Sequence, residues 1–344
     1  MPPRRGYLLP CLRKSYLNSF MSTRRPTVSV CCITYNHEQF LVQTIESVLM
    51  QQTDFEVEMV IGEDCSTDST RRIAQAYEKQ YPGRIRVLTP NTNLGIMPNL
   101  MATMAACQGE YIAFLEGDDY WTDANKLQIQ VEALRANPDC ALCFHDAEIF
   151  DDGEPDQPVL VFSQQVAAHA LPPPTAQGAT RRFTQLDLAR AGWIIPSASM
   201  LFRASSLPQP LPAWFAGVYS GDYTLHLLST RRGPALYLPR LMSRYRQHDQ
   251  SVSSTMVQSV YQFERRVYEA KMFQQHVFEP RHRKYADIYL ANQYSGYARY
   301  LRGQGQRGPA LRYFAKALFL SRQRLPLYLE RRLGSWRAPA AAVQ

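Results

Sequence analysis

The sequence contains no run of 18 or more apolar residues, so it predicts no helix that crosses a membrane. Its first residues lack the apolar core of a signal peptide, and we therefore expect a chain that is not exported. It also contains neither a Walker sequence nor a GxGxxG motif. These two absences disfavour a P-loop kinase and a dinucleotide-dependent dehydrogenase.

Cysteines are few and irregularly spaced. There are seven in 344 residues, an odd number without the spacing of a disulfide framework, which favours reduced thiols and a cytoplasmic protein. Cys140 and Cys143 form a CxxC pair, but no second pair and no pair of histidines stands nearby to complete a zinc site. A metal or redox role for this pair is therefore disfavoured.

Acidic residues are scarce at both ends of the chain, whose net charge is +8. Of 38 Lys/Arg and 30 Asp/Glu residues, positions 1–30 hold six basic and no acidic ones, and positions 271–337 hold 14 basic and three acidic ones, which leaves 18 basic and 27 acidic residues between them. Basic ends suit an anionic membrane surface or nucleic acid, although a solvated helix face is the commoner cause. The acidic centre and the lack of a nucleic-acid-binding motif disfavour nucleic acid.

What the sequence does contain is a strand, loop and helix rhythm over residues 27–135. The length allows one large domain with an appendage, or two domains, and 45% hydrophobic with 20% charged residues is typical of a soluble globular protein. Apolar patterning predicts strands at 27–35, 56–62, 84–89 and 110–116, and helices at 38–51, 68–81 and 97–107. The alternation predicts an α/β fold with a parallel sheet flanked by helices.

Polar clusters follow three of these strands: TYNHE at 34–38, EDCSTDST at 63–70 and EGDD at 116–119. Ligands of parallel sheets bind beyond the carboxyl ends of the strands, so we expect the clusters to meet there. Asp118 and Asp119 are hard oxygen ligands for Mg²⁺ or Mn²⁺, and a cation would relieve the repulsion among the carboxylates. The alternative is an acidic turn before a helix in TDANKLQIQVEAL, 122–134, with Asp123 as its N-cap.

The second cluster predicts two features. Ser66 or Thr67 suits the N-cap of the helix that starts near Asp68. Asp64 is not needed as a cap and is free to accept the imide N–H of a uracil or thymine ring, while the amides at the helix start favour anionic groups.

Four motifs occur in one order along the chain: VSVCCITYNHEQFLVQTIESVLMQ, EVEMVIGEDCSTDSTR, NTNLG and GEYIAFLEGDDYW. Together they resemble the inverting glycosyltransferases of family 2, whose GT-A fold is a Rossmann-like, mostly parallel sheet flanked by helices. The likeness covers residues 27–135 well and extends weakly to about residue 255. Processive members carry a QxxRW motif and spanning helices, and neither is present, so the resemblance implies a non-processive enzyme.

The resemblance implies roles for residues of the three clusters. Asp118 would hold ribose or the metal, and Asp119 the metal on the diphosphate. Glu116 occupies the first acidic position of the DxD-like motif, where Asp is more usual. Many members have an Arg after NLG, whereas this stretch is IMPNLM, so either Asn99 substitutes or the contact is absent. The nucleotide base would be held by four residues: Thr34, Tyr35, Glu38 and Asp64.

Three further segments resemble family motifs. YSGDYTLHLLSTRRG, 219–233, implies that Asp222 is the general base, and a helix cap is the alternative. SRYRQHDQSVS, 243–253, implies His248 as a metal ligand and Arg246 as a diphosphate contact, and a surface position with neither role is the alternative. WIIPSASMLFR, 193–203, would line the acceptor side, with Trp193 and Ser199 as candidates, and packing is the alternative for Trp193.

We expect three segments in the chain. Residues 1–26 form a basic N-terminal arm, whose first 20 residues are disordered or lie upstream of the real start at Met21. Residues 27–255 form the catalytic domain, with a nucleotide-sugar half at 27–135 and an acceptor half at 136–255 that includes a Pro- and Gln-rich loop at 151–180. Residues 256–337 form a helical C-terminal extension, interrupted at 303–309.

The last predicted helix, 310–333, has apolar residues on one side and many basic residues on the rest. The apolar side consists of Leu311, Phe314, Leu318 and Leu325. Two accounts stay open: a helical hairpin packed on the catalytic domain, and a basic amphipathic helix on an anionic membrane.

The resemblance thus implies a glycosyltransferase that uses Mn²⁺ or Mg²⁺. It would move one sugar from a UDP- or dTDP-linked donor to a hydroxyl of a glycan or lipid-linked acceptor in cell-surface polysaccharide synthesis. The expected location is the cytoplasm, in association with the inner face of the membrane. A catalytically silent glycosyltransferase-like binding or scaffold protein is the alternative.

Overall fold

The structure is a computed structural model that describes residues 26–153, 158–161, 180–249 and 259–322. Three predicted features lie outside the described residues: the N-terminal arm up to residue 25, most of the loop at 151–180, and the last helix beyond residue 322 with Leu325. Among the described helices, none is both long and apolar enough to span a membrane.

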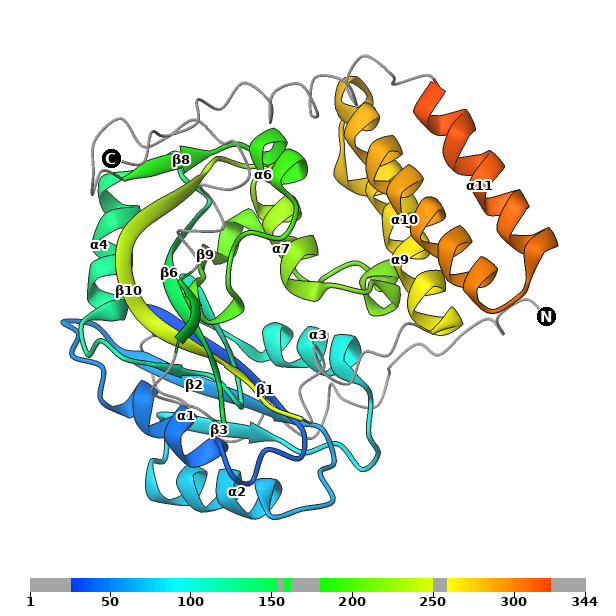
Figure 1. The fold of residues 1–344 in the computed structure, drawn as a ribbon. Helices are drawn as coiled ribbons and strands as arrows, with labels where there is room; N and C mark the ends of the chain where they lie inside the picture. The colour runs from blue at the N-terminus through cyan, green and yellow to red at the C-terminus, as the bar shows by residue number, and fades with distance from the viewer. Residues whose placement is uncertain (1–25, 154–157, 162–179, 250–258, 323–344) are drawn as a thin grey trace, which may run out of the picture.

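One mixed sheet runs through the molecule and contains ten strands within the described residues (Figure 1). Its order is β3-β2-β1-β4-β9-β6-β10-β5, with β7 beside β6 and β8 beside β10. The first four strands are parallel, as predicted. The strands are β1 (Val28–Thr34), β2 (Val57–Glu63), β3 (Ile85–Leu88), β4 (Tyr111–Glu116), β5 (Tyr120–Trp121), β6 (Leu142–Asp151), β7 (Pro158–Val161), β8 (Arg181–Phe183), β9 (Leu201–Arg203) and β10 (Ala235–Gln247).

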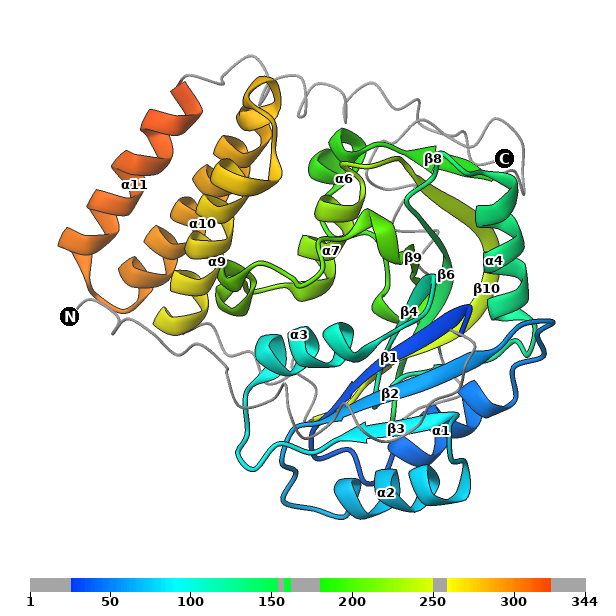
Figure 2. The ribbon, with the colours of Figure 1, turned by 180° about the vertical axis from the view of Figure 1, so that it is seen from behind.

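Helices cover both faces of the sheet (Figures 1 and 2). Successive side chains of a strand point to opposite faces, so Val30 and Cys32 of β1 join one core while Cys31 and Ile33 join the other. The first core is closed by α1 (Leu41–Leu49), α2 (Thr70–Gln80) and α4 (Lys126–Ala136). The second is closed by α3 (Ile96–Ala106), α6 (Gln185–Ala191) and α7 (Gly221–Ser229).

Two predicted helix caps are wrong. The N-cap of α2 is Ser69, not Ser66 or Thr67, because the hydroxyl of Ser66 instead accepts from the backbone N–H of Asn36, 3.0 Å away. The N-cap of α4 is Asn125, not Asp123. The Asp123 carboxylate lies two residues earlier and accepts from the backbone N–H of Asn125 at 2.8 Å, which makes a local turn.

The region after residue 136 contains more strands than expected. β6 continues to Asp151, and β7 pairs with it in antiparallel register inside the segment predicted as a loop. β9 lies between β4 and β6 and is antiparallel to both, so the two halves of the domain share one sheet.

Hydrogen bonds from buried side chains hold the short helix η1 (Ser197–Ser199) against this sheet. The indole N–H of Trp121 donates to the carbonyl oxygen of Ala198 at 2.9 Å, and the side-chain amide of Gln130 donates to that of Ser199 at 2.8 Å. The fully buried Lys126 donates to Gln130 at 2.7 Å, and burial lowers the pKa of its ammonium group to about 7. η1 is therefore held in place by β5 and α4.

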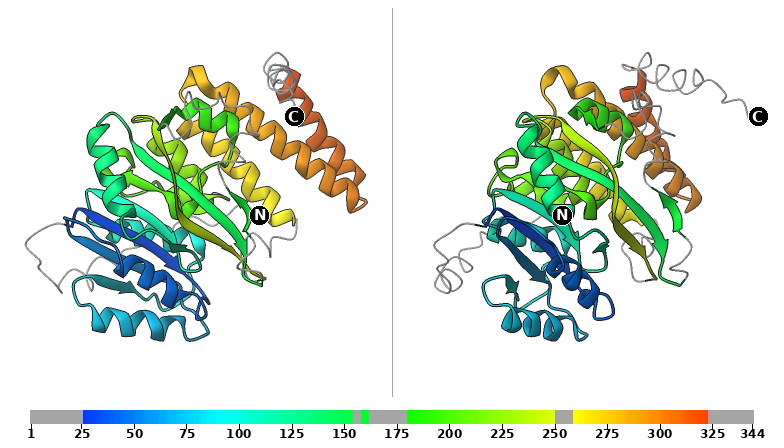
Figure 3. Two further views of the ribbon diagram at one scale, coloured as in Figure 1. Left: turned by 60° about the vertical axis from the view of Figure 1, so that its left-hand side comes forward. Right: turned by 90° about the vertical axis from the view of Figure 1, so that its left-hand side faces the viewer.

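The C-terminal helices extend away from the sheet (Figure 3). α10 and α11 pack side by side, and the break between them confirms the interruption predicted at 303–309. α11 begins at Arg307 rather than at residue 310, and its side chains Leu311, Phe314 and Leu318 are 68%, 49% and 54% exposed. The segment comprises α9 (Val260–Met272), η4 (Phe273–Val277), η5 (Pro280–His282), α10 (Arg283–Gly303) and α11 (Arg307–Arg322).

Candidate active site

The polar clusters meet where three neighbouring parallel strands end. Thr34 at the end of β1 is paired with Glu63 at the end of β2, and Ile33 is paired with Glu116 at the end of β4. The strand order β2-β1-β4 places these ends side by side. The expectation that the three clusters share one edge of the sheet is confirmed.

The loops after β1 and β2 are joined by hydrogen bonds. The side-chain oxygen of Asn36 accepts from the backbone N–H of Thr67 at 2.9 Å. The backbone N–H of Glu38 donates to Asp68 at 3.1 Å, and the carboxylate of Glu38 accepts from the backbone N–H of Ser69 at 2.8 Å. The two loops therefore form a single ledge at the sheet edge.

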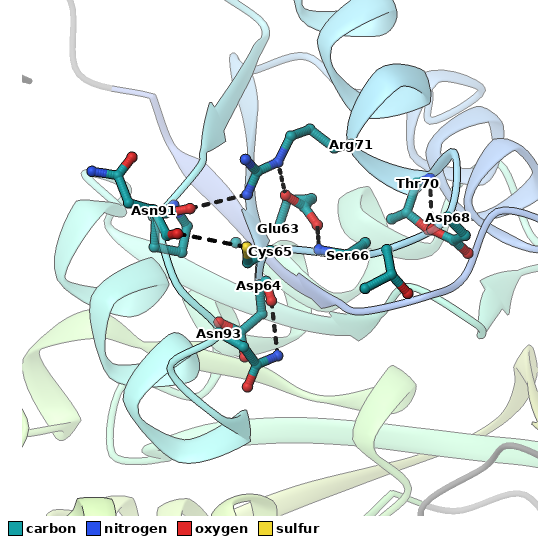
Figure 4. Close-up of polar contacts among 12 residues, drawn as sticks. Glu63, Asp64, Cys65, Ser66, Asp68, Thr70, Arg71, Asn91 and Asn93 are labelled. Carbon is teal, nitrogen blue, oxygen red and sulfur yellow. Dashed lines mark hydrogen bonds and ion pairs between the residues drawn. The ribbon is translucent and has the colours of Figure 1, made fainter.

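Glu63 and Arg71 form an ion pair beneath this ledge (Figure 4). This pair was not predicted from the sequence. The Glu63 side chain is buried and lies 2.5 Å from Arg71 Nε, while its second oxygen accepts from the backbone N–H of Ser66 at 2.6 Å. Arg71 also donates to the carbonyl oxygen of Pro90 at 3.0 Å. Only the fold reveals the pair, because an acidic residue at a strand end carries no local signal for it.

Asp64 holds the next loop of the chain, which contains the NTNLG motif. Its two carboxylate oxygens accept from the backbone N–H groups of Leu94 and Gly95 at 2.7 and 2.9 Å. Its carbonyl oxygen accepts from the Asn93 side chain at 2.9 Å (Figure 4). Gly95 has φ +85°, which glycine adopts without strain. The base contact predicted for Asp64 stays a prediction, now beside this role in the loop.

The other predicted nucleotide contacts differ in exposure. Tyr35 is 42% exposed, whereas Thr34 is buried and its hydroxyl has no hydrogen-bond partner within the part of the chain that the structure describes. Asn99 is buried on α3, where its side-chain amide donates to the carbonyl oxygen of Gly62 at 2.8 Å. Asn99 therefore fixes α3 on β2, and its predicted contact with the donor stays a prediction.

The acidic turn after β4 is tightly held by its backbone. The N–H of Gly117 donates to Ile33 at 2.9 Å, and the hydroxyl of Thr44 on α1 lies within hydrogen-bond distance of the carbonyl oxygens of Gly117 and Asp119. A Cβ at position 117 would lie 2.4 Å from the Thr34 hydroxyl, so the turn requires glycine there. The carboxylates are thereby kept at fixed positions.

Arg246 of β10 supports this turn. Its backbone N–H donates to Asp119 Oδ1 at 2.9 Å and its Nε donates to the carbonyl oxygen of Asp118 at 3.0 Å. The guanidinium also pairs with Asp152 and donates to Gln43. Because its side chain is only 9% exposed, we interpret Arg246 as a structural residue that holds the acidic turn in place. The predicted diphosphate contact stays a prediction.

Two histidines flank Asp118. His248 Nε2 lies 3.2 Å and His37 Nε2 lies 3.8 Å from Asp118 Oδ2, and one ligand atom of each of the three residues falls within 4.8 Å of the others. His248 was predicted as a ligand from the sequence, whereas His37, which lies in the first cluster, was not. These three side chains can hold a metal ion. Asp119 adds a buried carboxylate oxygen, Oδ2, that has no hydrogen-bond partner among the described residues.

The carboxylates of the turn have different electrostatic surroundings. Burial raises the pKa of Glu116 to about 8, helped by the negative charges of Asp118 and Asp222. Burial, with Asp118 and Glu116, also raises the pKa of Asp119 well above its usual value, and Arg246 opposes this shift only in part. Burial works against ionisation of Asp118 too, but the hydrogen bond from His248 and the charge of His37 hold its pKa below the ordinary value. The described side chains thus do not supply enough positive charge to stabilise the ionised forms of Glu116 and Asp119.

A second group of residues surrounds Asp222 in the first turn of α7. The N-cap is Ser220, so the alternative of a cap at Asp222 is wrong. Ser220 and the backbone N–H of Tyr223 donate to Asp222 Oδ1 at 2.5 and 2.7 Å, and the indole N–H of Trp193 donates to Oδ2. Ser197 of η1 lies 3.5 Å from the same Oδ2. Four neighbours therefore orient one carboxylate.

Of the two predicted acceptor residues, Trp193 is in this group and Ser199 is not. Trp193 is 38% exposed, while Ser199 is fully buried and donates to the carbonyl oxygen of Pro196 at 2.7 Å. The serine that reaches Asp222 is Ser197, two residues earlier. The helical turn at 197–199 places Ser197 rather than Ser199 beside Asp222, and the predicted acceptor contact of this stretch stays a prediction.

A hollow of about 530 Å³ opens beside His248. It lies between the loop after β1 and the ends of β6 and β10, and it is lined by Asn36, Glu38, Gln39, Phe40, Asp68, Asp151, Asp152, Gly153, Gln247, His248 and Asp249. Its volume falls in the range of small-molecule sites.

Comparison with known proteins finds one matching family model and several relatives. Residues 29–197 match the family model described as Glycosyl transferase family 2. An uncharacterized protein of Mycobacterium tuberculosis is 33% identical over 222 residues, which are 64% of this chain and 59% of that protein. TuaG of Bacillus subtilis, named as a teichuronic acid biosynthesis glycosyltransferase, is 38% identical over 39% of this chain and 52% of its own length. The chain thus spans 59% or less of the length of these relatives.

A solved structure shares the fold. S. aureus TarS 1–349 in complex with UDP-GlcNAc superposes with a TM-score of 0.59 at 19% identity, over 90% of this chain and 88% of that one. At this identity the likeness concerns the fold alone. The predicted GT-A architecture with C-terminal helices is confirmed.

We expect Arg246→Met to lower the free energy of unfolding by about 1–3 kcal/mol, because it removes the guanidinium that pairs with Asp152 and donates to the carbonyl oxygen of Asp118, while the backbone N–H bond to Asp119 remains. Urea unfolding followed by circular dichroism measures this. The control Arg182→Met breaks an exposed pair with Asp139 and should cost about 1 kcal/mol or less. Equal losses of unfolding free energy in the two variants would contradict the role of Arg246 in holding the acidic turn.

Proposed function

We propose, on the premise that residues 29–197 of this chain belong to glycosyltransferase family 2, that the protein moves one sugar from a nucleotide-linked donor to an acceptor hydroxyl with inversion at the anomeric carbon. The observation that carries this proposal is the oriented carboxylate of Asp222. It lies near enough to Glu116 to raise the pKa of that residue, so it belongs to the same sheet edge as the acidic turn.

Asp222 is the general base of this reaction. As the acceptor oxygen bonds to the anomeric carbon, the bond from that carbon to the diphosphate oxygen breaks, and the hydroxyl proton passes to Asp222. The neighbouring Trp193 presents a partly exposed aromatic surface on which an acceptor sugar can stack. The acceptor half, 136–255, thus supplies the base, and the half at 27–135 holds the donor.

The donor is a UDP- or dTDP-linked sugar. Its base lies on the ledge formed by the loops after β1 and β2, near Tyr35, Glu38 and Asp64, and its ribose near Glu116 and Asp118. UDP is supported by the nucleotide sugar in the TarS complex and by the carboxylate of Asp64, which suits an imide N–H. The acceptor is a glycan or a lipid-linked glycan of a cell-surface polysaccharide, which the name of TuaG supports.

A divalent cation fits at the acidic turn. Asp118, His248 and His37 offer three ligand atoms and Asp119 an unpartnered buried oxygen, while the raised pKa values of Asp119 and Glu116 reflect negative charge that a cation would balance. The imidazole ligands favour Mn²⁺ over Mg²⁺. When bound, the ion supplies positive charge that stabilises the departing diphosphate.

The outer face of α11 contacts an anionic membrane. Leu311, Phe314, Leu318 and Phe319 are 68%, 49%, 54% and 66% exposed. α11 has no acidic residue, and the exposed Arg312 and Lys316 flank the apolar stripe, so the face combines apolar surface with charge complementary to anionic lipid. This contact would bring the site to a lipid-linked acceptor.

Asp222→Asn should lower the transfer rate by about 10²–10⁴-fold without weakening binding of the nucleotide, because only proton removal is lost. A panel of UDP- and dTDP-sugars in a transfer assay, with calorimetry of the nucleotide, measures both quantities. Asp54→Asn, on an exposed carboxylate, is the control. If the wild type binds nucleotide sugar but transfers nothing to any acceptor, the silent scaffold is the better account.

Mn²⁺ should bind with 1:1 stoichiometry in the presence of UDP. His37→Asn or His248→Asn should lower the affinity for Mn²⁺ by about 10-fold or more, since each substitution removes a ligand. Calorimetric titration of Mn²⁺ tests this. His276→Asn, which changes an exposed histidine on the C-terminal segment, should leave binding unchanged. Wild-type affinity in both ligand variants would exclude the proposed metal site.

The protein should sediment with phosphatidylglycerol-containing vesicles and not with pure phosphatidylcholine vesicles, and Phe314→Glu with Phe319→Glu should abolish sedimentation. The double variant places two negative charges in the apolar stripe. Lys271→Glu on α9, which removes an exposed positive charge elsewhere, should retain binding. Undiminished binding of the double variant would exclude α11 as the contact.

A further inference from the structure

α9 holds the backbone segment that leads to Asp222. Arg265 donates to the carbonyl oxygens of Ala216 and Val218 at 2.9 and 2.8 Å, and the hydroxyl of Tyr268 donates to that of Trp214 at 3.1 Å. With Glu269, these side chains lie three and four positions apart, on one face of the helix. α9 thus supports residues 214–220 along their length.

Glu269 ends this row and is fully buried. Its Oε2 accepts from the backbone N–H groups of Tyr219 and Ser220 at 2.9 and 2.7 Å, and its Oε1 accepts from the hydroxyl of Tyr289 on α10 at 2.8 Å. Burial raises the pKa of Glu269 to about 7, and the charge of Asp222 adds to the shift while the three hydrogen bonds oppose it. Both carboxylate oxygens are therefore engaged.

Ser220 connects this carboxylate to the general base. Its backbone N–H is held by Glu269, while its hydroxyl donates to Asp222 Oδ1 at 2.5 Å and its carbonyl oxygen accepts the N–H of Thr224 in the first turn of α7. A displacement of Ser220 would therefore move both the start of α7 and the carboxylate at its first turn. Two hydrogen bonds separate Glu269 from Asp222.

We propose that Glu269 is a positioning residue for the reaction: by fixing Ser220 it sets the place of the Asp222 carboxylate, so the C-terminal helices are part of the catalytic apparatus. This inference rests on the proposed function, in which Asp222 is the base. Misplacement of a reacting group by about 1 Å can lower a rate about 100-fold. A shift of this size is available, because shortening the side chain at position 269 by one methylene withdraws both oxygens from the 219–220 backbone.

The test compares Glu269→Asp, Glu269→Gln and the control Glu264→Asp, which shortens an exposed carboxylate on the same helix. We expect Glu269→Asp to lower kcat about 100-fold with KM for the donor within about twofold. Glu269→Gln keeps an acceptor oxygen of the right length and should recover kcat to within about threefold of the wild type. Thermal unfolding monitors the fold of each variant, and a wild-type kcat for a folded Glu269→Asp would overturn the proposal.

Ser220→Ala tests the route. If Glu269 acts through Ser220, the variant that combines Ser220→Ala with Glu269→Asp should lose little more kcat than Glu269→Asp alone. Losses that multiply would mean that the two residues act separately and would overturn the proposal.

A structural readout separates this inference from the proposed function. The indole N–H of Trp193 donates to Asp222, so its NMR resonance, assigned with Trp193→Phe, reports the position of the carboxylate. Glu269→Asp should shift this resonance, and Glu269→Gln and Glu264→Asp should not. A wild type without transfer activity would refute the proposed function, whereas an unchanged resonance in a folded Glu269→Asp would refute the positioning role whatever the activity.

Discussion

The burial of like charges in the turn after β4 is the constraint on which the rest of the site depends. Glu116, Asp118 and Asp119 lie within four positions, and a low-dielectric environment strengthens their repulsion. Arg246 keeps the turn in place through its own backbone N–H and through its guanidinium. Two histidines then stabilise Asp118, while Asp119 and Glu116 keep raised pKa values. The turn is folded, but it still attracts positive charge.

The groups that act on this turn come from late in the chain. β10 pairs in parallel with β6 and antiparallel with β5, the strand that directly follows the turn. Arg246 and His248 therefore lie beside residues about 130 positions earlier in the chain. α9 acts in the same way on the proposed base, because Glu269 holds the residue before α7. Residues 27–135, residues 136–249 and the C-terminal helices thus each contribute side chains to the candidate site.

The first half of the fold was predictable because its elements have clear periodicity. The predicted strands and helices of residues 27–116 differ from the observed ones by three residues or fewer at each end. The helix caps were not predictable. The hydroxyl of Ser66 can accept a hydrogen bond either from its own helix or from the loop at Asn36, and the tertiary structure places it at Asn36. β7 was missed because its segment is rich in Pro and Gln, and pairing with β6 outweighs that composition.

The sequence by itself determined the α/β class, the family resemblance, the meeting of the polar clusters at one sheet edge and the identity of the acidic turn. These follow from local patterning and from the geometry of parallel strands. Only the tertiary structure decided that His37 joins His248 at Asp118, that Ser197 rather than Ser199 reaches Asp222, and that Glu269 holds Ser220. Each of these contacts depends on how distant elements pack, and no short-range spacing in the sequence encodes that packing.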